Sequence, residues 1–211
     1  MNKTSIIILG DFSEWYGVNR RNFYQAISKN DIEEIDVFLS SYGGEAAEAL
    51  TIYDMLKGHK AKVNIYLSGV VASAATIVAC AGDNIIASPS NIYMIHKASL
   101  FTFGNSDDLR YSASILDVFD EKIVSIFEKR VSNKKTLKKE NIWKLLNDAT
   151  WMTSETAAEL GFVDTVQDFT FDFEGQQIGW GIFATDPKKI ETVENYETNI
   201  KVIQSAIKSK G

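Results

Sequence analysis

Residues 63–81 read VNIYLSGVVASAATIVACA, and this stretch decides the fold class. Its first part, Val63–Leu67, is a short apolar run with β-branched residues, which is typical of a strand. Gly69 interrupts the run, and residues 72–81 continue as a segment of small and apolar side chains. A helix that is apolar on every side is a buried helix. The stretch therefore predicts a strand that leads through a glycine turn into a helix in the protein interior.

The same alternation of strand and helix continues in both directions along the chain. The apolar patterns predict strands at 6–9, 35–39, 85–87 and 92–95, and helices at 19–30, 45–57, 107–131 and 141–147. Alternation of this kind indicates an α/β domain with a mostly parallel sheet.

The composition changes near residue 167. Residues 168–199 contain seven acidic residues and two lysines. Strands are expected at 162–166, 169–173 and 178–183, followed by a helix that begins at Asp186-Pro187, since proline suits the first turn of a helix. We therefore expect a domain at 1–166 and an acidic C-terminal extension at 167–211.

The composition also excludes several classes of protein. With 211 residues, 45% of them hydrophobic and 24% charged, the chain matches one globular domain. Its net charge of −6 argues against nucleic-acid binding, which needs clustered cations. A single cysteine, Cys80, excludes an internal disulfide and fits a reducing compartment. No apolar run approaches the ~20 residues of a membrane span, and no signal peptide is evident. We expect a soluble, cytoplasmic protein without membrane or nucleic-acid partners.

Three positions could carry chemistry. His96 directly follows the strand at 92–95, and functional groups gather at the carboxyl ends of parallel strands. Ser73 lies in the first turn of the buried helix, where free N–H groups favour an oxyanion. Gly43-Gly44 offers further N–H groups at another strand-to-helix turn. Taken singly, each has a structural alternative: a core histidine, a helix-capping serine and a tight turn.

Metal and phosphate sites have little support. The chain has two histidines and one cysteine without ligand spacing, so we expect no metal. The Gly43-Gly44 pair matches no phosphate-binding loop, and we expect no cofactor.

Five segments lie in a fixed order and spacing. They are VFLSSYGG at 37–44, LTIYDML at 50–56, ASA at 72–74, YMIH at 93–96 and SETAAELGFVD at 154–164. Together they resemble the caseinolytic protease ClpP and its phage-type relatives, within the crotonase-like superfamily. Tyr42 is a departure, because the family has proline there. The resemblance implies a ClpP-like β-α-β superhelix in which the helix at 107–131 is a long protruding handle.

The resemblance also implies a serine endopeptidase with a Ser–His–Asp triad. Ser73 is then the nucleophile and His96 its general base, and the backbone N–H groups of Gly44 and Ala74 form the oxyanion hole. The family's aspartate aligns with Ala149, which is not an acid, so we assign the third position to the preceding residue, Asp148. The alternative is that Asn147 or a backbone carbonyl orients His96.

The implied partners are a protein or peptide substrate and further copies of this chain, in a heptameric ring or double ring. Peptide is expected to add as a strand near 101–105. The TWMT segment at 150–153 resembles phage-encoded members, which process capsid or scaffold protein in the prohead. Three alternatives remain open: a housekeeping-type ClpP working with an AAA+ unfoldase, a catalytically dead ring-forming relative, and a crotonase-like acyl-CoA enzyme.

Overall fold

The computed structural model describes residues 2–15, 17–28, 31–132, 137–171 and 176–179. Eight strands form one sheet. Six of them lie in the order β6-β5-β3-β2-β1-β8. Off this path, β4 pairs with β3, and β7 pairs with β4. The strands are β1 (Lys3–Leu9), β2 (Glu34–Ser41), β3 (Lys62–Ala72), β4 (Asn84–Ala87), β5 (Ile92–Ile95), β6 (Thr150–Thr153), β7 (Thr165–Val166) and β8 (Gln176–Gly179). The helices are α1 (Arg20–Ile27), α2 (Ala46–Gly58), α3 (Ala74–Ala79), α4 (Ser106–Ser132), α5 (Lys139–Asn147) and α6 (Ser154–Glu159).

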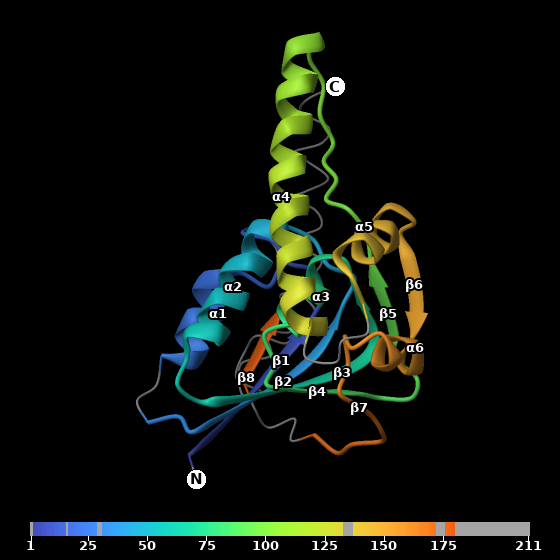
Figure 1. Cartoon of the computed structure of the whole chain (residues 1–211). Helices are drawn as coiled ribbons and strands as arrows, with labels where there is room; N and C mark the ends of the chain where they lie inside the picture. The colour runs from blue at the N-terminus through green and yellow to red at the C-terminus, as the bar shows by residue number, and fades with distance from the viewer. Residues whose placement is uncertain (1, 16, 29–30, 133–136, 172–175, 180–211) are drawn as a thin grey trace, which may run out of the picture.

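The expected parallel α/β sheet is confirmed. Every pairing between these strands is parallel except that of β5 with β6. Helices α1, α2, α3 and the base of α4 lie together on one face of the sheet (Figure 1). All six residues of α3 are buried, as its apolar sequence predicts.

Strand β3 positions the site because it changes partner along its length. Asn64–Leu67 pairs with β4, whereas Val70–Ala72 pairs with β5. Gly69 lies between the two parts with a φ of +60°, a conformation that glycine adopts at little steric cost. The strand thereby brings its own carboxyl end beside the end of β5, where the two candidate catalytic side chains follow.

Helix α4 is the predicted handle, and it projects away from the sheet (Figure 1). Its N-terminal half is mainly exposed to solvent, and its buried residues begin at Asp120. The remaining buried positions, Ile123, Val124, Ile126, Phe127 and Val131, pack on the core. Only the C-terminal part of α4 packs on the core, so the N-terminal part projects from the body.

The sequence prediction fails at two places between α4 and residue 166. Strand β6 was not expected, and it closes the sheet edge by antiparallel pairing with β5. The strand expected at 162–166 is confined to Thr165–Val166. Phe162 is a core residue instead: its ring lies 5.7 Å from that of Tyr93 and 5.4 Å from that of Phe127.

Part of the expected C-terminal extension joins the sheet. No strand forms at 169–171, where Phe169 and Phe171 pack on Tyr66 of β3. Strand β8 overlaps the start of the strand expected at 178–183 and runs parallel to β1. The helix expected after Asp186 lies outside the described residues, so the boundary at 166/167 stays a prediction.

Candidate active site

Ser73 occupies a strained turn between β3 and α3. Its φ of +55° and ψ of −128° are rare for a residue other than glycine and cost about 1–3 kcal/mol. Its N–H donates to the Met94 carbonyl at 2.9 Å. Its own carbonyl accepts from the Thr76 N–H at 3.0 Å and from the Thr76 hydroxyl at 2.6 Å. These bonds hold the strained turn. The Ser73 side chain makes no capping bond to α3, so the helix-cap alternative does not account for it.

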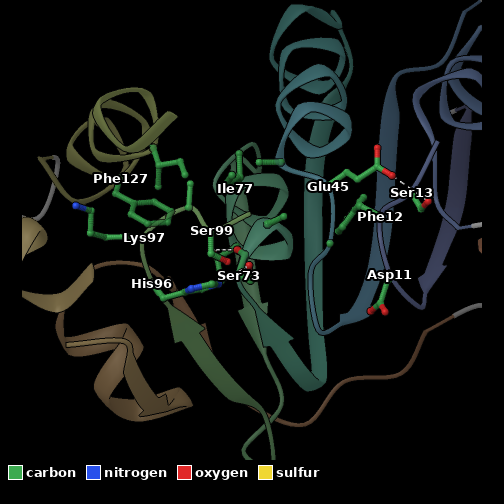
Figure 2. Close-up of a pocket in the computed structure, with 16 residues that line it drawn as sticks. Asp11, Phe12, Ser13, Glu45, Ser73, Ile77, His96, Lys97, Ser99 and Phe127 are labelled. Atoms are coloured by element: carbon green, nitrogen blue, oxygen red, sulfur yellow. Dashed lines mark hydrogen bonds between the residues drawn. The ribbon is translucent and has the colours of Figure 1, made fainter. Parts of the chain in front are cut away.

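His96 directly follows β5 and faces Ser73. Its Nε2 lies 2.7 Å from the Ser73 Oγ, and Figure 2 shows the ring and the hydroxyl pointing toward each other. Burial lowers the pKa of the imidazole from its usual value, and the negative charge of Asp120 partly opposes this shift. A lowered pKa keeps the ring neutral near pH 7, and only the neutral ring accepts the hydroxyl proton at Nε2.

The turn at Gly43-Gly44 needs two glycines. Their φ values are +108° and +121°, which other residues rarely adopt. A Cβ on Gly43 would lie 2.6 Å from the Ser73 Cβ, and one on Gly44 would lie 2.3 Å from the Phe12 carbonyl oxygen. The backbone of this turn is therefore packed directly against the Ser73 turn.

Gly44 and Ala74, whose N–H groups are the predicted oxyanion donors, lie in these two adjoining turns. Gly44 lies between two residues whose backbone groups bond to Phe12, but within the described part of the chain its own N–H has no recorded acceptor. Ala74 is the first residue of α3, where the N–H has no partner within the helix. Both residues line the pocket that holds Ser73 and His96.

The pocket itself has a volume of about 500 Å³. Its walls combine apolar side chains with three charged ones. The apolar residues are Phe12, Ala46, Ala74, Ile77, Ala98, Ile123 and Phe127, and the charged ones are Asp11, Glu45 and Lys97. Such a mixture suits a ligand whose backbone forms hydrogen bonds with the site and whose apolar side chain is buried in it.

A comparison with known families assigns the chain. The sequence profile of the family described as Clp protease matches residues 4–169. The chain belongs to the Clp protease family. Clp proteases are serine peptidases that form oligomeric rings.

Individual relatives agree with this assignment. The ATP-dependent Clp protease proteolytic subunit of Deinococcus radiodurans is 29% identical over 150 residues, which cover 70% of this chain and 72% of the relative. The solved structure of a ClpP1 mutant from Listeria monocytogenes matches with a TM-score of 0.66 and 22% sequence identity. The match covers 79% of this chain and 92% of the ClpP1 chain. The predicted ClpP-like fold is therefore confirmed.

Asp148, which the sequence favoured as the third catalytic residue, lies at the C-cap of α5. Its side chain is 53% exposed and pairs with Lys144 of the same helix. Within the described residues no hydrogen bond joins it to His96. Its assignment to the triad of this Clp protease stays a prediction.

A different carboxylate lies close to the histidine loop. Asp120 of α4 is buried and accepts a hydrogen bond from the Ala98 N–H at 2.7 Å. Sequence reasoning missed it. The available signal was an acid within the apolar stripe of the handle helix, four residues after Leu116 and three before Ile123.

Other chemistry finds no support among the described residues. They contain no cluster of His, Cys, Asp and Glu that could hold a metal ion. Burial raises the pKa of the Cys80 thiol to about 12, so it stays protonated and unreactive. In the same part of the chain, no helix combines the length and apolarity needed to cross a bilayer.

Proposed function

We propose that this protein is a serine endopeptidase that cleaves peptide bonds with Ser73 as nucleophile and His96 as general base. One observation carries the proposal: the 2.7 Å contact between the His96 Nε2 and the Ser73 Oγ, beside a pocket of substrate size. A serine hydroxyl is a poor nucleophile until a base takes its proton.

The chemistry proceeds in two halves. The Ser73 Oγ forms a bond to the scissile carbonyl carbon while its proton passes to the His96 Nε2. The tetrahedral intermediate then breaks its C–N bond, and His96 returns the proton to the leaving amine. Water repeats the sequence on the acyl-enzyme and frees the carboxylic acid. No metal or cofactor is called for.

The oxyanion of each intermediate is proposed to lie against the N–H groups of Gly44 and Ala74. Both belong to backbone turns fixed by packing, and donors held in advance are the effective ones. Loss of one such donor typically costs about 10²–10³ in rate.

The substrate is proposed to be a polypeptide with an apolar side chain on the acyl side of the cleaved bond. Support comes from the wall formed by Ile77, Ile123 and Phe127, which lies on the same pocket as Ser73. Burying a large apolar side chain contributes about 1.5–3 kcal/mol to binding.

The assembly is proposed to be a heptameric ring or a pair of rings. The exposed half of α4 carries apolar side chains that need a partner, among them Leu109, Tyr111 and Val118. For the biological setting, the TWMT segment supports capsid or scaffold processing in a phage prohead. The name of the Deinococcus radiodurans relative supports an ATPase-driven subunit instead.

Hydrolysis of fluorogenic peptides with apolar and with charged acyl-side residues tests the activity. We expect turnover of the apolar peptides by the wild type, and none by Ser73→Ala or His96→Ala at unchanged oligomer mass. An intact oligomer that cleaves nothing would favour the catalytically dead relative. Degradation of a folded protein only with an AAA+ unfoldase and ATP would favour the housekeeping setting.

A further inference from the structure

Asp120 is a buried charge that the proposed mechanism does not yet use. Only 1% of its surface is exposed, and it is the first buried residue of α4 after the protruding half. Burial of a carboxylate is costly unless the charge is paired and hydrogen-bonded. The burial of this carboxylate therefore indicates that its charge has a specific role.

The polar side-chain contacts of Asp120 among the described residues lie on the loop that carries His96. One carboxylate oxygen accepts from the Ala98 N–H at 2.7 Å, and the other lies 3.2 Å from the Lys97 Nζ. The Lys97 ammonium in turn sits 5.7 Å from the centre of the Trp143 ring on α5. The two residues after His96 are thus fixed between α4 and α5.

We propose that Asp120 is the positioning residue for His96, taking the role that a triad aspartate has elsewhere. The proposal rests on the proposed peptidase function. Asp120 acts in two ways. Its hydrogen bond to Ala98 fixes the backbone two residues after the histidine, and its negative charge stabilises the imidazolium that forms when Ser73 gives up its proton.

The charges around His96 favour Asp120 over the alternatives. Asp11 and Glu45 line the same pocket as His96, and Lys97 directly follows His96 in the sequence. Asp148, near the start of β6, is half exposed and paired with Lys144. Of these groups, Asp120 is the one whose charge raises the pKa of His96 against the effect of burial.

The test compares Asp120→Asn with two control variants in which another carboxylate is likewise replaced by its amide. The introduced asparagine keeps the shape of the side chain and an oxygen for the Ala98 N–H, and it replaces the charged oxygen that faces Lys97 with a neutral NH2 group. Asp148→Asn makes the same change at the sequence-predicted position. Glu121→Gln makes it one residue along α4, at an exposed side chain paired with Lys139.

Peptide hydrolysis is followed against pH, with Ser73→Ala as the blank. For Asp120→Asn we expect kcat to fall about tenfold, a part of the ~10²–10⁴ that general-base catalysis contributes. KM should stay unchanged, because Asp120 does not touch the substrate. The acid limb of kcat/KM should move to lower pH, because the removed charge raised the pKa of the histidine.

A merely structural Asp120 would lower stability or assembly without moving the acid limb. Asp120→Asn with wild-type kcat and acid limb overturns the proposal, as does a loss found in Asp148→Asn instead. Wild type no more active than Ser73→Ala refutes the peptidase itself, and the positioning role with it. A loss of activity in Glu121→Gln as large as in Asp120→Asn also counts against the proposal.

Lys97→Met decides the matter if Asp120→Asn does not fold or assemble. The Lys97 side chain is 40% exposed, and in this variant Asp120 keeps its hydrogen bond from the Ala98 N–H. Without the ammonium, Asp120 is less neutralised and holds the proton on His96 more strongly. We expect the acid limb to move to higher pH, and an unmoved limb overturns the proposal.

Discussion

The packing of Gly43 against the Ser73 turn makes one substitution especially informative. In Gly43→Ala the new Cβ would lie 2.6 Å from the Ser73 Cβ, 2.8 Å from the Ala72 oxygen and 2.9 Å from the Ala74 nitrogen. Ordinary contact begins at 3.4 Å, so the Ser73 turn must retreat by about 0.8 Å. Ala74 carries a proposed oxyanion donor, and the displacement therefore reaches the nucleophile and the donor together.

The magnitude follows from this displacement. A misplacement of about 1 Å costs about 10² in rate, so we expect the turnover of an apolar peptide to fall about 10²-fold. A side chain at a φ of +108° also adds strain, which we put at about 2 kcal/mol. For a protein of this size, that strain lowers Tm by about 4–8 °C.

Gly58→Ala is the matched control, because a Cβ there meets nothing within 4 Å. Gly58 is the last residue of α2, where alanine forms helix more readily. Peptide turnover and thermal unfolding are measured on both variants. We expect Gly58→Ala to keep full activity and an equal or higher Tm. Wild-type turnover in Gly43→Ala would refute the reasoning that ties this turn to the nucleophile.

Three further predictions concern the same molecule. The acid limb of kcat/KM in the wild type should lie below pH 6.5, because burial lowers the pKa of His96 and the neutral form is the base; a limb above pH 6.5 in a pH–rate profile would contradict this. Ala46→Phe should fill part of the apolar pocket and raise KM for peptides with large acyl-side residues more than for those with small ones; equal changes in steady-state kinetics would remove Ala46 from the binding site. Arg130→Met should lower the free energy of unfolding by about 1.5–3 kcal/mol, measured by denaturant titration. The reason is that the Arg130 side chain is only 12% exposed and its guanidinium donates to the Phe162 carbonyl and to Asp164. An unchanged midpoint would mean that these bonds contribute nothing to stability.

The sequence was sufficient for features that depend on local pattern. The buried helix after Ser73 follows from a segment with almost no polar side chain, and the handle follows from its long helical stripe. The pairing of Ser73 with His96 was predicted from the resemblance to Clp proteases, and it fits two strand ends that meet at the same edge of one parallel sheet.

Features that depend on packing between distant segments were not accessible. Strand β6 is short and pairs antiparallel with β5, so no alternation of its own identified it. Phe162 looked like a strand residue, but its environment is set by Tyr93 and Phe127. Asp120 differs from the other acids of α4 only because that turn of the helix faces the loop after His96. The Asp148 assignment rested on aligning a motif, and no geometry was available to compare the two acids.

Intact-mass measurement after treatment with a fluorophosphonate tests the central claim most directly. The reagent bonds its phosphorus to an activated serine oxygen and releases fluoride, so it reports on the nucleophile without a chosen substrate. The account predicts one adduct per subunit on the wild type and none on Ser73→Ala or His96→Ala, with all three proteins assembled to the same mass. An assembled wild-type protein that takes up no adduct, or an adduct that persists in Ser73→Ala, would contradict it.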